Sequence, residues 1–215
     1  MDERSTGLIL RLRPLTETSL IVHWLTPDLG RLATVAKGAR RSKSPFRGKI
    51  DLFFRADFSF ARSRRSELHT LREVSLLDSF PGLRRDLVLL NQMSYATTLI
   101  EQTTETDTPI PEIFDLMTGF ANHVANHPPQ ITSMLAFEMK LLHQLGMEPN
   151  LTWRKMSSRA NDLIPLLQNG LWDDLAGLIS DKPELREIYQ FLNQFMLFHL
   201  GKIPRGRAKA FAQPA

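Results

Sequence analysis

The feature that most constrains the fold is a change in the spacing of apolar residues near Pro81-Gly82. Before this point apolar and polar residues alternate, which is typical of β-strands with one buried face. After it, apolar residues recur every three or four positions, which is typical of helices. A Pro-Gly pair commonly interrupts regular structure. The pattern therefore predicts an α+β protein of two domains, with strands in residues 1–80 and helices in residues 81–215.

Five runs before the boundary have the character of strands. The clearest is the fourth, in which Phe54, Phe58 and Phe60 share one face and polar residues occupy the other. Residues 26–30, T-P-D-L-G, predict a hairpin turn because Pro presets φ and Gly tolerates a positive φ. Five strands joined by such turns suit a small barrel. The five runs are residues 8–13, 19–25, 31–36, 52–61 and 68–77.

The second half predicts helices whose apolar stripes pack a helical core, although a leftover groove could receive an apolar peptide end. We expect the residues after Pro204 to form only a frayed tail, because they are few, basic and small. The predicted helices have apolar residues from 87 to 100, a start at Pro109 or Pro111 with an end before Pro128, a span of about 131–146, and a span of 183–201.

Composition excludes several classes of site and location. The 215 residues contain no cysteine, which rules out disulfides, thiolate metal sites and cysteine nucleophiles. No apolar run approaches the ~18–20 residues of a membrane helix, and the acidic start lacks the apolar core of a secretory signal. We therefore expect a cytoplasmic protein that does not contact a membrane.

Positive charge is concentrated in the first half. Residues 1–85 hold 17 Lys and Arg against 9 Asp and Glu, whereas the remainder holds 10 against 14. The densest segment is residues 37–49, where glycine, serine and proline indicate a loop without any acidic residue. Such a loop can follow a phosphate backbone without demanding a base sequence. Its six basic residues, the predicted DNA-binding residues, are Lys37, Arg40, Arg41, Lys43, Arg47 and Lys49.

Two further basic clusters are expected to join this loop in one continuous surface. Arg62, Arg64 and Arg65 follow the fourth strand and are also predicted to bind DNA, and a third cluster lies in the first strand at residues 11 and 13. The alternative is that these side chains only solvate loops, as most charge runs do. Among the aromatic residues, Phe46 is the candidate for base stacking, whereas the others are expected to be core residues.

No catalytic or metal-binding residue can be nominated. Gly48-Lys49 lacks the other elements of a phosphate-binding G-x-x-x-x-G-K-[ST] loop, and no serine-hydrolase or zinc-protease motif occurs. His123 and His127 have the spacing of a ligand pair, but no acidic residue accompanies them and Pro128 ends the helix. The sequence therefore predicts a protein without enzymatic activity, metal or cofactor. A nuclease or nucleotidyl transferase that assembles distant carboxylates, such as Asp51 with Asp57, is the enzymatic alternative.

Several segments resemble the RecO family of recombination mediators. The N-terminal signature lies in residues 7–10 (G-L-I-L), 16–22 (T-E-T-S-L-I-V) and above all 35–44 (V-A-K-G-A-R-R-S-K-S), and residues 137–149 and 198–201 resemble later parts of the family. The resemblance implies an OB-fold barrel followed by a mostly α-helical domain. It also implies binding of single- and double-stranded DNA, annealing of complementary strands and help in loading recombinase. The implied partners are RecR and the single-strand-binding protein.

The chain departs from that family at its zinc site. Many members place zinc-binding cysteines after the stretch that corresponds to residues 146–149, where this chain continues L-T-W-R-K-M at 151–156. We therefore expect no zinc, with packing around Trp153 and Met156 in its place. The alternative function is an RNA-binding OB-fold module without annealing activity, which would share the basic loop.

Overall fold

The computed structural model describes residues 2–147, 156–177 and 183–212. Internal contacts divide the chain into two compact units. The first contains the residues up to Phe80 together with Thr104–Asp115, and the second contains Pro81–Thr103 together with the residues from Leu116 onward. The division into domains at 1–80 and 81–215 stays a proposal, and the contacts group residues 104–115 with the strands.

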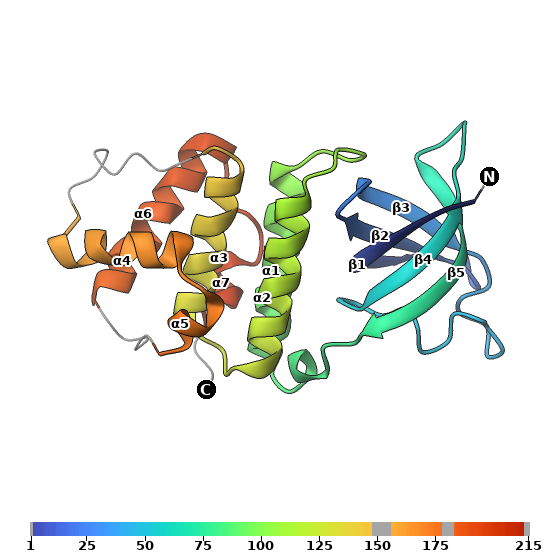
Figure 1. Ribbon diagram of the computed structural model, residues 1–215, viewed down its shortest axis with the longest axis horizontal. Helices are drawn as coiled ribbons and strands as arrows, with labels where there is room; N and C mark the ends of the chain where they lie inside the picture. The colour runs from blue at the N-terminus through green and yellow to red at the C-terminus, as the bar shows by residue number, and fades with distance from the viewer. Residues whose placement is uncertain (1, 148–155, 178–182, 213–215) are drawn as a thin grey trace. The chain divides into compact units, whose positions relative to one another are not determined.

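The first unit is built on a closed five-stranded barrel with the strand order β1-β2-β3-β5-β4 (Figure 1). Its pairs are antiparallel except for β3 with β5, which run parallel. This confirms the predicted OB-fold barrel, and each of the five predicted strands corresponds to an observed one. The strands are β1 Asp2–Pro14, β2 Leu20–Thr26, β3 Gly30–Ala36, β4 Arg55–Ala61 and β5 Leu68–Asp78.

Two strand boundaries differ from the prediction for identifiable reasons. Strand β1 begins six residues earlier because its polar start pairs with β4, whereas its later part pairs with β2 from Leu8 onward, with a bulge after Ile9. Strand β4 begins at Arg55 rather than at Leu52. Phe53 has a φ of 65°, which a strand cannot accommodate, and the Phe54 N–H donates to the Asp51 carbonyl across a turn.

The barrel core is aromatic. Trp24 of β2 stacks on Phe58 of β4 with ring centroids 4.1 Å apart, and Phe60 stacks between Phe58 and His69. The Trp24 indole N–H donates to the Thr34 hydroxyl at 2.9 Å, so the buried polar group is satisfied. The alternating apolar face predicted for the fourth strand is therefore confirmed at Phe58 and Phe60.

Residues 104–115, which we call the strap, dock on the barrel beside the β2–β3 turn. The Arg31 guanidinium donates to the hydroxyl and carbonyl of Thr104 at 2.8 and 2.6 Å, and the Asp107 N–H donates to the Arg31 carbonyl at 2.9 Å. Gly30 has a φ of +70° and lies against the Thr108 backbone, which leaves no space for a Cβ atom. The strap is thus held through both backbone and side-chain groups.

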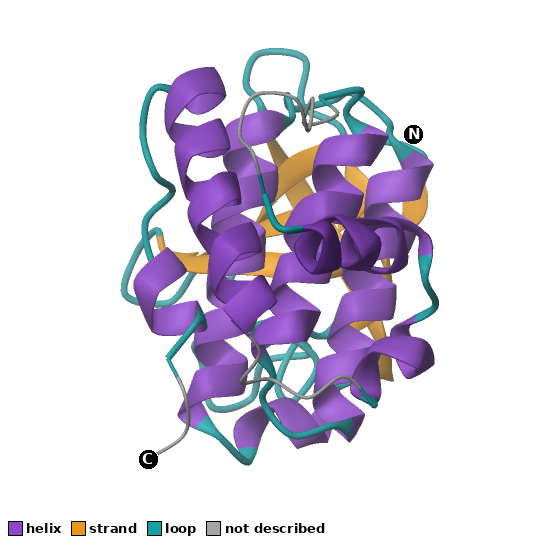
Figure 2. Ribbon diagram, turned by 90° about the vertical axis from the view of Figure 1, so that its left-hand side faces the viewer, coloured by secondary structure: helices purple, strands orange, loops and turns teal. Residues whose placement is uncertain are grey.

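The second unit is helical (Figure 2). Its central helix is α3, Ile131–Gln144, which contacts α1, α4, α5 and α6 and is buried on almost every side. The predicted helices at 111–127, 131–146 and 183–201 are confirmed with small differences in their ends. The elements are η1 Pro81–Arg84, α1 Leu87–Thr103, α2 Pro111–Asn126, α3, α4 Ser158–Asn169, α5 Trp172–Ala176, α6 Pro183–Leu200 and α7 Arg207–Ala210.

Helix α7 corrects the expectation of a frayed tail. Arg207 is 2% exposed, and its guanidinium makes two hydrogen bonds to the fully buried Glu138 carboxylate, at 2.7 and 2.8 Å. The same guanidinium donates to Asn193 at 3.0 Å and lies 4.0 Å from the Tyr189 ring centroid. Burial disfavours the charge, but the hydrogen bonds that Arg207 donates to the Glu138 carboxylate outweigh this effect and raise the pKa of Arg207. The prediction of a frayed tail was wrong because Arg207, which was expected to be exposed to solvent, has a buried partner 69 residues away in sequence.

Two other details of the helical unit were not predicted. Helices α4 and α5 had no counterpart in the predicted set. In α1, Leu87 is 71% exposed and Leu90 is half-buried, whereas the buried stripe includes Leu89 and Ala96. The helical period of α1 was predicted. At the N-terminal end of the helix, however, the buried residues lie on a different face from the one expected.

Candidate nucleic-acid interface

The basic loop, residues 37–49, is folded into successive turns between β3 and β4. Backbone N–H groups of Arg41, Ser44, Arg47 and Lys49 each donate to the carbonyl three residues earlier, at 3.0–3.2 Å. The Arg40 N–H and guanidinium donate to carbonyls of the β1–β2 loop at 2.9 and 3.1 Å. The loop therefore has a defined shape.

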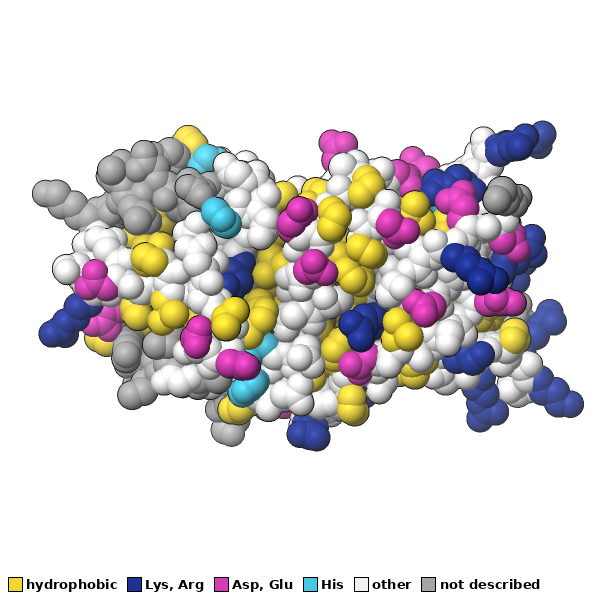
Figure 3. Space-filling view, in the orientation of Figure 1, with side chains coloured by type: hydrophobic (Ala, Val, Ile, Leu, Met, Phe, Trp, Pro, Cys, Tyr) yellow, Lys and Arg dark blue, Asp and Glu magenta, His cyan; other side chains and the backbone are white. Residues whose placement is uncertain are grey.

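All six basic side chains of the loop are exposed. Within the described residues none of them forms an ion pair with a carboxylate, and the guanidinium groups of Arg40 and Arg47 bond only to carbonyl oxygens. Figure 3 shows Lys and Arg side chains projecting from the barrel, at the right of the view. Unpaired cations on an ordered loop are suited to contact phosphate, which is an acceptor only.

Phe46 corrects the prediction of an exposed stacking residue. Its side chain is 7% exposed and packs in the barrel core with Trp24 and Phe58 among its cluster. The Phe46 N–H donates to the buried Ser44 hydroxyl at 3.2 Å, so the centre of the loop is anchored inward. Flanking residues Pro45 and Arg47 are exposed, which is why the sequence suggested that the ring between them was exposed too.

Replacing Phe46 with leucine tests whether this ring anchors the loop or contacts bases. We expect a loss of about 1–1.5 kcal/mol in the free energy of unfolding, because leucine fills the same space incompletely. Affinity for a single-stranded oligonucleotide should change by less than about twofold, since a stacking residue would contribute ~1–3 kcal/mol. Urea unfolding and fluorescence anisotropy measure the two effects, and a large loss of affinity at unchanged stability would contradict the anchor.

The other predicted site residues lie elsewhere on the barrel. Arg62 is committed to Glu3 through two hydrogen bonds of 2.7 and 2.9 Å, which raise the pKa of Arg62 and lower that of Glu3. Arg64 and Arg65 are exposed in the β4–β5 loop.

The expected continuous basic surface stays a prediction. Arg13 is exposed at the end of β1, three residues before the Thr16 carbonyl that binds Arg40, so it lies on the side of the basic loop. Arg11 is half-buried in β1. Arg13 therefore lies near the basic loop, whereas Arg64 and Arg65 lie in the β4–β5 loop.

A groove of about 360 Å³ separates the β1–β2 loop from the start of the basic loop, and we call it the loop groove. Cationic side chains of Lys37 and Arg41 line it together with the hydroxyl-bearing Thr16, Thr18 and Ser19. The Ser19 hydroxyl accepts from the Gly38 N–H at 3.3 Å, which ties the two loops together. Sequence reasoning did not select these hydroxyl residues, although the polar T-E-T-S run between two strands was the available signal.

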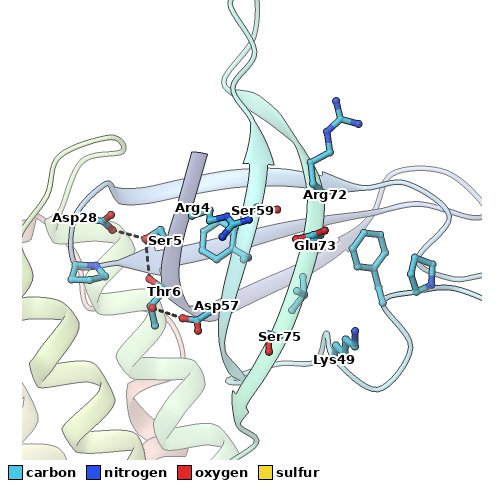
Figure 4. A pocket seen from close by; sticks show the side chains of 15 residues that line it. Arg4, Ser5, Thr6, Asp28, Lys49, Asp57, Ser59, Arg72, Glu73 and Ser75 are labelled. Atoms are coloured by element: carbon cyan, nitrogen blue, oxygen red, sulfur yellow. Dashed lines mark hydrogen bonds between the residues drawn. The ribbon is translucent and has the colours of Figure 1, made fainter. Parts of the chain in front are cut away.

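A larger groove of about 930 Å³, which we call the face groove, crosses β1, β4 and β5 (Figure 4). Two of its carboxylates already accept hydroxyl hydrogen bonds, Asp28 from Ser5 and Asp57 from Thr6. Its charged lining is balanced between three cations and three anions, so it offers no net attraction to phosphate. These residues are Arg4, Lys49, Arg72, Asp28, Asp57 and Glu73.

The histidine pair of the helical unit is stacked rather than convergent on a common point. His123 and His127 have ring centroids 4.5 Å apart, and the buried His123 bonds to the Ser133 hydroxyl at 2.9 Å. Burial, with the neighbouring His127, lowers the pKa of His123 to about 4. The residues that the structure describes contain no group of three potential metal ligands. Trp153, expected to pack where other members bind zinc, lies outside the described residues.

Two protein-family models match the chain. Residues 1–80 match the family model described as recombination protein O N terminal, and residues 84–154 match recombination protein O C terminal. The chain belongs to the RecO family. The OB-fold barrel and the helical region that follows it are thus the architecture of a RecO DNA-repair protein, as the resemblance in residues 35–44 implied.

Curated RecO proteins from distant bacteria are similar to the chain. The DNA repair protein RecO of Rhodopirellula baltica is 34% identical over 143 residues, which is 66% of this chain and 53% of the relative. Those of Listeria monocytogenes serotype 4b and Anaeromyxobacter dehalogenans are 28% and 30% identical over 69% and 68% of this chain, and the match covers 58% of each relative. The chain thus spans somewhat more than half the length of these RecO relatives.

No helix among the described residues combines the length and apolar character that crossing a bilayer requires.

Proposed function

We propose that this chain is a non-catalytic mediator of recombinational repair that binds single- and double-stranded DNA through the basic loop. Membership of the RecO family supports the general role in DNA repair. The observation that carries the DNA-binding proposal is the set of six exposed cations without carboxylate partners on one ordered loop. Arg64 and Arg65 provide a secondary contact, and Arg62 acts mainly through Glu3 in holding the barrel together.

The proposed mechanism is electrostatic. Cations of the loop neutralise phosphates and release condensed counterions, which reduces the repulsion between two strands and accelerates their annealing without a covalent step. In this proposal the helical unit contacts RecR and the single-strand-binding protein, and the complex assists recombinase loading. The support for these partners is family membership.

Replacing Arg40, Arg41 and Lys43 together with alanine is expected to weaken DNA binding with little change in folding stability. Exposed substitutions usually alter stability by less than ~0.5 kcal/mol. Losing up to three phosphate contacts should reduce the slope of log affinity against log salt by about 2 for a single strand. Fluorescence anisotropy with an oligonucleotide across a salt series measures both the affinity and the slope.

The matched control removes three exposed cations from the helical unit, Arg159, Lys202 and Lys209, and changes the net charge equally. If the control variant loses as much affinity as the loop variant, binding depends on overall charge and the loop is not the site. A fluorescence-quench assay of two complementary strands tests annealing. Tighter binding to RNA than to DNA without annealing would favour the RNA-binding alternative.

A further inference from the structure

We infer that the barrel grips a DNA strand by its sugar-phosphate backbone alone and leaves the bases unstacked from the protein and free to pair. This rests on the proposed function and specifies which part of the DNA is recognised. The argument combines the position of the aromatic rings, the chemistry of the loop groove and the neutrality of the face groove.

The aromatic side chains of the barrel are directed inward. All seven in residues 2–80 are buried except Phe54, which is half-buried and packs against the core. The rings stack on one another, as in the Trp24–Phe58 pair, and Phe46 anchors the basic loop instead of extending from it. Single-strand binders that recognise bases present aromatic faces to them. In this barrel those aromatic faces pack against one another in the core.

The loop groove has the chemistry of a phosphate site. The Thr16 hydroxyl accepts the Ser19 N–H at 3.1 Å, and the Ser19 hydroxyl accepts the Gly38 N–H at 3.3 Å. Because each oxygen already accepts a hydrogen bond, its own proton remains available to donate. Lys37 and Arg41, both exposed, add positive charge at the same groove. Donors and cations together match phosphate oxygens, which only accept.

The face groove offers no competing path for the backbone. Its cations Arg4 and Arg72, with Lys49 at the end of the basic loop, are balanced by an equal number of carboxylates, so a backbone that continued into the groove beyond Lys49 would gain no net attraction. A strand that follows the basic loop therefore has its phosphates against the protein and its base edges exposed to solvent. A complementary strand can pair with those edges without displacing the protein.

The test compares an ordinary oligonucleotide with an abasic strand of equal length, using the full chain and fluorescence anisotropy across a salt series. We expect the two affinities to agree within about threefold with equal salt slopes, because phosphates alone are recognised. A site that depended on stacking would bind the abasic strand at least about tenfold more weakly, and that result would overturn the inference.

Two variants locate the grip. Replacing Lys37 and Arg41 with alanine should weaken binding of both strands by the same factor, whereas replacing Arg4 and Arg72 of the face groove should weaken neither. Weakening by the second pair alone would also overturn the inference. If the unaltered chain binds neither strand, the proposed function itself fails. If it binds only the strand that carries bases, DNA binding stands and the backbone-only grip fails.

Discussion

Replacing Arg207 with methionine is expected to lower the free energy of unfolding by about 3–5 kcal/mol, the usual effect of removing one partner from a buried ion pair. Glu138 is fully buried and would lose both guanidinium hydrogen bonds. Its remaining partner would be the Tyr95 hydroxyl, whose pKa is raised well above its usual value by burial and by the Glu138 charge, so this hydroxyl stays protonated and donates. Urea unfolding followed by circular dichroism measures the loss.

Two companion variants separate this charge effect from a general effect of altering α7. Lys209→Met lies on the same short helix but is exposed, and should change stability by less than ~0.5 kcal/mol. The double variant Arg207→Met with Glu138→Leu removes both charges and should recover much of the loss. A loss below about 1 kcal/mol in Arg207→Met would match an exposed ion pair and contradict the docked position of α7.

Replacing Gly30 with alanine should cost about 2–5 kcal/mol of unfolding free energy. The left-handed φ of +70° costs an alanine ~1–2 kcal/mol, and overpacking commonly adds ~1–3 kcal/mol. A Cβ atom there would lie 2.3 Å from the Thr108 carbonyl oxygen, so the strap must move away from the β2–β3 turn. Urea unfolding gives the loss, and faster cleavage at Glu105 or Glu112 by a Glu-specific protease reports release of the strap.

The basic loop supplies a matched control for this substitution. Gly48 has nearly the same backbone angle, with φ of +73°, but nothing lies within 4 Å of its added Cβ atom. Gly48→Ala should therefore show only the cost of the backbone angle, about 1–2 kcal/mol. The difference between the two variants measures the contact with the strap. Equal losses of unfolding free energy in the two variants would mean that Gly30 is needed only for its φ and that the strap can move away without destabilising the fold.

Much of the fold was predictable because burial patterns repeat along single elements. The alternation in β4 and the stripe in α6, which includes Ile188 and Leu192, both fall on buried faces. The parts that were missed depend on pairing between distant residues. Arg207 resembles a surface residue in the sequence because its buried partner Glu138 is distant. The strap docks partly through backbone groups, which leave no side-chain pattern in the sequence.

The candidate site was predicted only in part, because a local charge pattern is visible in the sequence and pairing between distant residues is not. A run of cations without acids indicates an exposed loop directly, and all six are exposed. The sequence could not show that Arg62 is paired with Glu3, 59 residues away, or that Phe46 turns into the core. Its neighbours Pro45 and Arg47 are exposed, and local composition cannot distinguish an anchoring ring from an exposed one.

The strap also determines how this chain can be recombined with its relatives. Since residues 104–115 return to the barrel after α1, the two units are interleaved in the chain rather than joined in series. A chimaera that exchanged everything after residue 80 would bring a foreign strap to the Arg31 and Gly30 contacts. Exchanges that keep the native 104–115 segment with its own β2–β3 turn should tolerate a new helical unit better. The strap and that turn are thus expected to be inherited together.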